Sequence, residues 1–221
     1  MVYGWIKTSL IDYPDNISVV LFTAGCNLQC KYCHNHKLIT ETDIDRIPNT
    51  QVIEYLTKHI RKYDGVVITG GEPTLYPHLT TLITAIKALG LKVKLDTNGT
   101  NPDIVMHLHE LHLLDYVALD IKGGPYVNDP NIKRLTDYLK CGTLDYEFRS
   151  TVYPEYFTAD TLPAILDLVK GANRYILQQY QPVAGKCELP PFTERELMQL
   201  KEYFTPHVTN CTTRGIKKWK I

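Results

Sequence analysis

The sequence predicts an α/β protein, an open partial (β/α)6 barrel similar to part of a TIM barrel. Short apolar runs rich in β-branched residues alternate with longer segments of helical periodicity, and polar residues follow nearly every predicted strand. This alternation is typical of right-handed crossovers in a parallel sheet, and about six units are too few for the eight of a closed barrel. A doubly wound open sheet would give the same order of elements, so periodicity alone does not separate the two architectures.

The predicted elements follow one another along the chain with short connections. Each predicted strand is an apolar, β-branched run bounded by turn residues, and the strands lie at 17–22, 66–69, 91–95, 116–120, 146–152 and 174–180. Each predicted helix repeats apolar residues at helical spacing, and the helices lie at 50–63, 77–89, 103–111, 131–139, 161–169 and 193–203. The closing GIKKWKI fits either a last strand or a basic tail.

Composition predicts one soluble globular domain over residues 1–221. The chain has 44% hydrophobic and 22% charged residues, which is enough apolar material for a sizeable core. Its 24 basic and 24 acidic residues balance, so no global field attracts nucleic acid or an anionic membrane. No secretory signal and no apolar stretch of about 18 residues is visible, so we expect a cytoplasmic protein that does not enter the membrane.

Three of the six cysteines are close together in a segment, 23–36, that follows the first predicted strand. In a reducing compartment they are better explained as metal ligands than as a disulfide framework. Cys26, Cys30 and Cys33 would supply three ligands to a [4Fe–4S] cluster and leave one iron open. The other three cysteines lie far apart, and we expect them to be small buried or half-buried side chains: Cys141, Cys187 and Cys211.

Other sites remain open for the cysteine segment. A structural zinc site needs a fourth ligand, which would be His34, His36 or a remote cysteine. The C-x-x-C-H pattern from Cys30 to His34 matches covalent haem attachment, although we would expect an exported protein for that chemistry. A redox-active C-x-x-C pair does not call for the third cysteine. An iron–sulfur cluster is the favoured interpretation.

The cysteine spacing C-x-x-x-C-x-x-C, with an aromatic residue before the last cysteine, resembles the signature of the radical S-adenosylmethionine (SAM) superfamily. The resemblance extends along most of the chain, and together these segments look like the anaerobic ribonucleoside-triphosphate reductase activating proteins, within the activases of glycyl radical enzymes. The matching segments are 7–14, 22–26, 33–35, 70–73, 95–99, 118–122 and 146–149.

The resemblance implies an activity. In such activases a reduced cluster passes one electron to SAM, and the resulting 5′-deoxyadenosyl radical abstracts the α-hydrogen of a glycine on a partner enzyme. The partner implied here is the anaerobic ribonucleoside-triphosphate reductase. No second cysteine cluster is visible, so an external donor such as flavodoxin or ferredoxin is expected. A radical SAM enzyme that acts on a small molecule or a peptide is the alternative, and a non-catalytic zinc- or haem-binding protein is a third.

The resemblance also implies roles for individual residues. Tyr32 would lie near the adenine of SAM, and Gly70, Gly71 and Glu72 would meet the methionine amino group. Four further residues are expected to bind SAM: Asn98, Lys122, Arg149 and Gln178. Oxygen atoms at the ends of two strands would hold Na⁺ or K⁺, and they belong to Asp96, Thr97 and Asp120.

Two residues depart from the family pattern. Asp15 follows Pro14 where the family has glycine, and His36 follows Asn35 where the family has proline. Both are expected near the mouth of the cluster site. They leave the SAM chemistry intact and bear on which partner is served.

Overall fold

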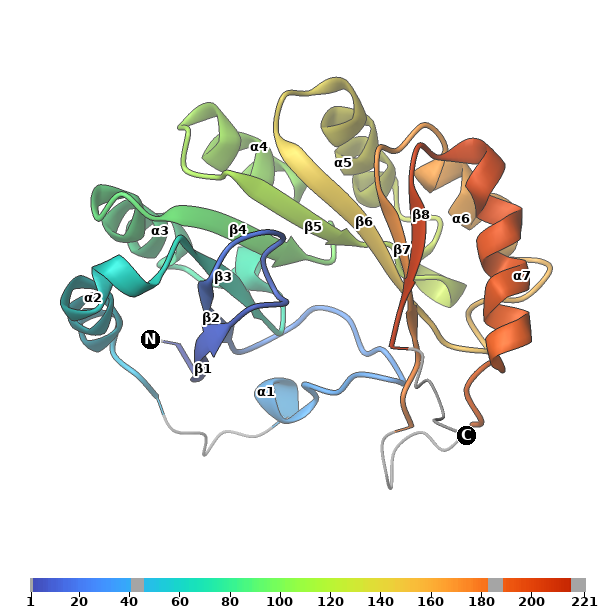
Figure 1. Ribbon diagram of the computed structural model, residues 1–221. Helices are drawn as coiled ribbons and strands as arrows, with labels where there is room; N and C mark the ends of the chain where they lie inside the picture. The colour runs from blue at the N-terminus through green and yellow to red at the C-terminus, as the bar shows by residue number, and fades with distance from the viewer. Residues whose placement is uncertain (1, 41–45, 183–188, 216–221) are drawn as a thin grey trace. The chain divides into compact units, whose positions relative to one another are not determined.

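The computed structural model describes residues 2–40, 46–182 and 189–215. Within them the strands form one open eight-stranded sheet in the order β1 to β8, with β1 and β8 as its end strands (Figure 1). The strands are β1 (Gly4–Ser9), β2 (Ser18–Thr23), β3 (Gly65–Gly70), β4 (Lys92–Thr97), β5 (Tyr116–Asp120), β6 (Asp145–Val152), β7 (Tyr175–Gln179) and β8 (Cys211–Arg214). The predicted open α/β architecture is confirmed.

Helices α2 to α7 alternate with the strands as the sequence predicts, whereas the short α1 was not predicted. The α-helices are α1 (Lys37–Thr40), α2 (Asn49–Lys58), α3 (Leu79–Ala88), α4 (Pro102–Glu110), α5 (Pro130–Cys141), α6 (Leu162–Val169) and α7 (Glu194–Phe204). Single 3-10 turns are η1 (Ile60–Lys62), η2 (Pro73–Leu75), η3 (Gly124–Tyr126) and η4 (Thr205–His207). No helix among the described residues is both long and apolar enough to cross a bilayer.

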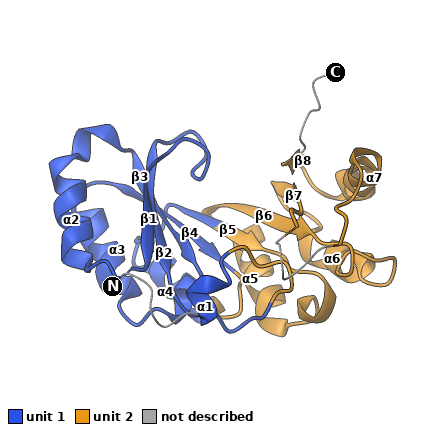
Figure 2. Ribbon diagram, turned by 90° about the horizontal axis from the view of Figure 1, so that it is seen from below, with its two compact units in different colours: residues 1–29, 35–97, 103–117 blue, residues 30–34, 98–102, 118–221 orange. Residues whose placement is uncertain are grey.

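The chain divides into two compact units (Figure 2). Unit 1 comprises residues 1–29, 35–97 and 103–117, and unit 2 comprises residues 30–34, 98–102 and 118–221. The expectation of a single domain over residues 1–221 stays a prediction.

In unit 1 the strands β2, β3 and β4 pair in parallel, and β1 pairs antiparallel to β2. The parallel strands are buried on both faces and therefore read as continuous apolar runs, such as Val66 to Ile68 at 0% exposure. Helices α2 and α3 lie on one side of these strands (Figure 2). The apolar stripe of α3, with Leu82, Ile83 and Ile86, is buried.

In unit 2 the strands β6, β7 and β8 pair in parallel. Helix α5 begins after Asp129, whose carboxylate accepts a hydrogen bond from the Asn131 N–H at 2.8 Å, with Pro130 at the first helical position. Helix α7 begins with a capping box in which Thr193 and Glu196 satisfy each other's main-chain N–H. These caps fix where each helix starts.

The two end strands, β1 and β8, were not predicted from the sequence. Residues of β1 alternate poorly and expose Ile6, and β8 is only four residues long with two threonines and an arginine. An end strand has one neighbour, so polar residues are tolerated and the apolar signal is weak. The closing segment 216–221 lies outside the described residues.

The outlying cysteines differ in their surroundings. Cys211 is buried at the start of β8, as expected. The expectation was wrong for Cys141, which is exposed because it ends α5 beyond the apolar stripe of Ile132, Leu135 and Leu139. Cys187 lies outside the described residues.

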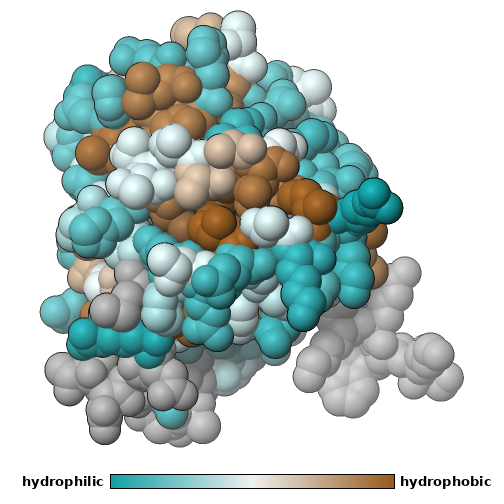
Figure 3. Space-filling model, turned by 90° about the vertical axis from the view of Figure 1, so that its left-hand side faces the viewer, coloured by the Kyte–Doolittle hydropathy of each residue, from teal (hydrophilic) through white to brown (hydrophobic). Residues whose placement is uncertain are grey.

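Apolar side chains gather on part of the surface of unit 1. Figure 3 shows brown apolar patches bordered by hydrophilic residues on the side that carries α2 and α3 in Figure 1. In the connection between β1 and β2, Leu10 is 72% exposed and Ile11 is 83% exposed. Single exposed apolar residues are normal, but here two adjacent ones are exposed, although Tyr13 in the same connection is buried in the core.

Candidate functional site

The cysteine segment follows directly from β2. The Leu28 N–H donates to Cys26 Sγ at 3.4 Å, and the Cys33 N–H donates to the Cys30 carbonyl at 3.2 Å. None of these three cysteines forms a disulfide, and Cys30 is buried while the other two are half-buried. Cys26 belongs to unit 1, whereas Cys30 and Cys33 belong to unit 2. Among the described residues, no three His, Cys, Asp or Glu side chains are grouped so that they could hold a metal ion.

The main chain of unit 1 fixes the start of this segment against the end of β3. The Gly71 N–H donates to the Thr23 carbonyl at 2.9 Å, and the Glu72 N–H donates to the Gly25 carbonyl at 2.8 Å. A Cβ on Gly70 would lie 2.3 Å from the Thr23 oxygen, and one on Gly71 would lie 1.9 Å from the Gly25 oxygen. Only glycine allows this approach, since a real Cβ needs more than 3 Å.

Further contacts hold the far end of the cysteine segment in unit 1. The Asn35 Nδ2 donates to the Gly70 carbonyl at 3.1 Å, and the Gly25 N–H donates to the Leu38 carbonyl at 2.9 Å. The His36 carbonyl accepts from the Ile39 N–H at 3.0 Å and thereby begins α1. The family proline is thus replaced by a residue that opens a short helix.

Asp15, the other departure, adopts a left-handed backbone conformation with φ at 59°. Aspartate tolerates this region better than most residues because its short polar side chain bonds locally.

Glu72 is a buried acceptor. Its Oε1 accepts from the Thr74 N–H at 3.1 Å, from Thr74 Oγ1 at 2.6 Å and from Thr97 Oγ1 at 2.7 Å. The side chain is 0% exposed and caps η2. These contacts join the end of β3 to the end of β4, so this carboxylate oxygen stabilises the fold. Its predicted contact with the amino group of SAM stays a prediction.

Asp96 and Thr97 end β4 in unit 1. Asp96 Oδ1 accepts from the Lys94 ammonium at 2.6 Å, and Lys94 is 0% exposed. Asn98, in unit 2, uses Oδ1 to accept from the Thr100 N–H at 3.0 Å and from its hydroxyl at 2.7 Å. The side chains of three consecutive predicted residues therefore have partners in their own unit.

A chain of opposite charges crosses the strand ends of unit 2. Asp120 ends β5 and pairs with Arg149 Nε at 3.0 Å and with Lys122 Nζ at 3.5 Å. Glu147 lies 3.9 Å from Arg149 Nη1 and 3.3 Å from Arg214 Nη2. The structure thus joins three predicted residues to two that the sequence analysis missed.

The missed residue Glu147 had a signal in the sequence. It precedes Arg149 by two positions on β6, so both side chains point to the same face of a strand. Glu147 is 0% exposed, and a charged residue in a buried strand needs a counter-charge. Arg214 lies on β8, which was not predicted, and no pattern in the sequence indicated the pair.

Tyr32 is buried among aromatic rings of unit 2. Its ring centroid lies 5.5 Å from that of Tyr153 and 5.7 Å from that of Tyr156, and the Lys122 ammonium lies 5.9 Å from its ring centre. Burial raises the pKa of the Tyr32 hydroxyl above its ordinary value.

Lys122 stays charged beside this ring. Burial by itself lowers the pKa of Lys122, but the neighbouring Asp120, Tyr32 and Cys30 outweigh it and hold the pKa above its usual range. The remaining predicted SAM residue, Gln178, is exposed on β7 beside Thr151 and Arg214 in register. The unit therefore presents a fixed cation next to an aromatic face.

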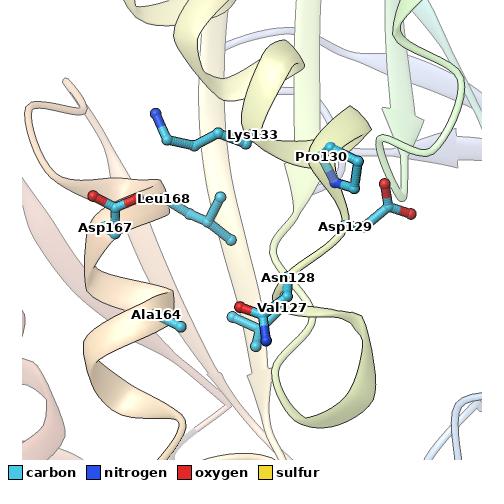
Figure 4. Close-up of a pocket in the computed structure, with 8 residues that line it drawn as sticks. All are labelled: Val127, Asn128, Asp129, Pro130, Lys133, Ala164, Asp167 and Leu168. Atoms are coloured by element: carbon cyan, nitrogen blue, oxygen red, sulfur yellow. The ribbon is translucent and has the colours of Figure 1, made fainter.

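A groove between α5 and α6 is separate from these residues. It has a volume of about 280 Å³, and Figure 4 shows side chains from both helices around it. Its lining is Val127, Asn128, Asp129, Pro130, Lys133, Ala164, Asp167 and Leu168. Asp129 caps α5 and Lys133 pairs with Asp137 at 2.7 Å, so these polar groups stabilise helix α5. None of the predicted site residues lines the groove.

Replacing Asp120 with asparagine is expected to lower the free energy of unfolding by about 2 kcal/mol. Removal of one partner from a buried pair costs about 3 to 5 kcal/mol, and the effect is smaller here because the Asp120 side chain is 35% exposed. Urea unfolding at neutral pH measures it. The matched control is Asp137→Asn, whose surface pair with Lys133 should contribute less than about 0.5 kcal/mol. If both variants lose the same free energy of unfolding, the ion pairs of Asp120 do not stabilise the protein more than a surface pair does.

Residues 20–140 match the radical SAM superfamily. A Methanocaldococcus jannaschii protein, provisionally named as a glycyl-radical enzyme activating enzyme, is 32% identical over 239 aligned positions, which cover 98% of this chain and 96% of that protein. The pyruvate formate-lyase-activating enzyme of Staphylococcus epidermidis is 33% identical over 135 residues, 56% of this chain and 52% of that enzyme. A 7-carboxy-7-deazaguanine synthase of Methanothermobacter thermautotrophicus is 28% identical over 183 residues, 79% of this chain and 65% of that enzyme.

Solved structures share the fold. SuiB of Streptococcus suis superposes with a TM-score of 0.67 at 18% identity, covering 90% of this chain and 49% of SuiB. A radical SAM methyltransferase of Sphaerobacter thermophilus gives 0.66 at 13% identity, covering 91% of this chain and 67% of that one. The chain therefore belongs to the radical SAM superfamily, in the family of glycyl-radical enzyme activating enzymes.

Proposed function

We propose that this chain installs a glycyl radical on the anaerobic ribonucleoside-triphosphate reductase, using SAM and a [4Fe–4S] cluster held by Cys26, Cys30 and Cys33. The observation that carries the proposal is the set of three cysteines, none in a disulfide, on the segment that follows β2. A four-iron cluster takes four ligands, so three thiolates leave one iron for a cofactor. When bound, the cluster and SAM would supply a radical that abstracts hydrogen.

The residues of the chain would bind and orient SAM. An amino group needs acceptors, and the glycines at 70 and 71 allow close approach to main-chain carbonyls. Lys122 and Arg149 supply positive charge for the carboxylate or the ribose, and Asp120 holds both in place. Tyr32 offers a buried ring for the adenine, with Asn98 and Gln178 as further contacts. The burial of Tyr32 and Asn98 would also help to exclude water from the reaction.

The segments shared with the ribonucleotide reductase activating proteins support the choice of target. The 32% identity with the M. jannaschii protein extends over nearly the whole chain, which favours an activase over other radical SAM functions. The proposal includes an external electron donor, flavodoxin or ferredoxin, because no further cysteine pair lies near the first three in the sequence. The predicted Na⁺ or K⁺ is not part of this proposal.

The test starts from protein reconstituted with iron and sulfide without oxygen. After reduction and addition of SAM, wild type is expected to form 5′-deoxyadenosine and methionine. The Cys30→Ala variant is expected to lose this activity by at least about 100-fold, because a cluster with two protein ligands is not held in place. Cys141→Ala is the matched control, since Cys141 is exposed at the end of α5. Equal activity in wild type and Cys30→Ala would refute the cluster assignment.

The target is tested separately by electron paramagnetic resonance. Incubation with the anaerobic reductase is expected to give a glycyl radical signal that needs SAM, and pyruvate formate-lyase serves as the alternative acceptor. If the signal forms only on pyruvate formate-lyase, the proposed target is wrong, but the chain is still an activase of glycyl radical enzymes. The similarity to 7-carboxy-7-deazaguanine synthases supports a second candidate, a small-molecule substrate. Cleavage of SAM without a radical on either enzyme would favour it.

A further inference from the structure

Lys94 is a fully buried cation in the middle of β4. It is 0% exposed, and its neighbours along the strand, Val93 and Leu95, are also 0% exposed. The ammonium lies 2.6 Å from Asp96 Oδ1 and 6.0 Å from the ring centre of Tyr116. Lysine is almost never buried in this way without a counter-charge, so the pair with Asp96 is what allows it.

The geometry of β4 brings the two charges together. Residues two apart on a strand point to the same face, so the stem of Lys94 runs along the sheet toward Asp96. The Asp96 side chain is 12% exposed, so little water screens the pair. A charge-assisted contact of this length in such surroundings is strong.

Asp96 is the residue that the resemblance assigns to Na⁺ or K⁺, together with Thr97 and Asp120. The surroundings of these residues do not fit that ion. Asp96 already holds an ammonium, and Thr97 Oγ1 donates its proton to Glu72 at 2.7 Å. In unit 2, Asp120 pairs with Arg149 and Lys122. A metal ion bound to Asp96 would meet the positive charge of Lys94 in a region of low dielectric.

We propose that Lys94 is a built-in cation: its ammonium takes the place at Asp96 that the resemblance gives to a monovalent metal ion, and the chain binds no Na⁺ or K⁺ there. Both groups carry a single positive charge, and an ammonium contacts oxygen at a distance similar to that of a monovalent ion. The tethered cation cannot dissociate, so its charge does not depend on the salt present. Its part in SAM binding rests on the proposed function, but the ion pair itself does not.

The first measurement uses the wild-type chain. Its melting temperature is expected to be the same in NaCl, KCl and choline chloride at equal ionic strength, and the sodium NMR line is expected to show no saturable broadening that KCl reverses. Saturable stabilisation by Na⁺ or K⁺, or broadening that KCl reverses, would overturn the proposal. These measurements need no SAM cleavage. Their outcome is therefore independent of whether the proposed function is correct.

The second measurement removes the charge with Lys94→Met, which keeps most of the buried stem. In choline chloride its melting temperature is expected to fall by roughly 10 °C, because Asp96 loses its buried partner. NaCl or KCl is expected to restore part of this loss in a saturable way, by binding where the ammonium was. A fall that neither salt reduces, or no fall at all, would overturn the proposal.

Two further variants complete the test. Lys94→Met combined with Asp96→Asn removes both charges, and it is expected to show no specific response to Na⁺ or K⁺. A response equal to that of the single variant would place the ion elsewhere and overturn the proposal. Lys92→Met is the matched control, since Lys92 lies two residues earlier on β4 and is exposed. If Lys94→Met does not fold, the wild-type measurements decide alone.

Discussion

Replacing Gly71 with alanine is expected to lower the free energy of unfolding by about 4 kcal/mol or more, at the far end of the range for single substitutions. The new Cβ would lie 1.9 Å from the Gly25 carbonyl oxygen and 2.7 Å from its carbon. Both are main-chain atoms that no rotamer change can move. The chain could relieve the clash only by breaking the Gly71 and Glu72 hydrogen bonds to Thr23 and Gly25. Denaturant unfolding measures the loss.

Gly90→Ala is the matched control. Gly90 has φ at +81°, but a Cβ there meets nothing within 4 Å. Its cost should therefore be the backbone strain alone, about 1 to 2 kcal/mol. Since Gly71 lies where β3 meets the cysteine segment, Gly71→Ala should also reduce the iron content after reconstitution. A Gly71→Ala variant as stable as Gly90→Ala would show that the close approach is not present in solution.

Replacing Glu72 with leucine is expected to cost about 3 to 5 kcal/mol. Three donors would lose their common acceptor: the Thr74 N–H, the Thr74 hydroxyl and the Thr97 hydroxyl. Thr74 is 8% exposed and Thr97 is 2% exposed, so water reaches neither readily. A buried donor without a partner costs about 1 to 3 kcal/mol. Thermal and urea unfolding both report it.

Glu72→Gln separates the fold from the chemistry. Its amide oxygen can still accept from the three donors, so the loss should be only about 1 kcal/mol, the difference between charged and neutral acceptors. If the Glu72 carboxylate also binds the amino group of SAM, Glu72→Gln should weaken SAM binding without unfolding the protein. If the glutamine variant is as unstable as the leucine variant, then the negative charge of Glu72, and not its hydrogen-bond acceptor, stabilises the contact between the ends of β3 and β4.

The predicted elements were largely confirmed because their causes are local. Tyr116 to Asp120 was predicted and observed with the same bounds, since a buried parallel strand reads as a short apolar run. The helix predicted at 50–63 was too long: α2 ends at Lys58 and a 3-10 turn follows at Ile60–Lys62. Helical periodicity does not distinguish these two helix types at an end.

The sequence by itself determined the family and the order of the six inner strands and of helices α2 to α7. The spacing of Cys26, Cys30 and Cys33 and the residues at the strand ends are properties of the chain, and they need no coordinates. Only the tertiary structure decided the partners of the charged groups. The pairs of Lys94 with Asp96 and of Glu147 with Arg214 depend on which faces of which strands are buried. Burial is a property of the assembled sheet, and it is burial that makes each of these charges require the other.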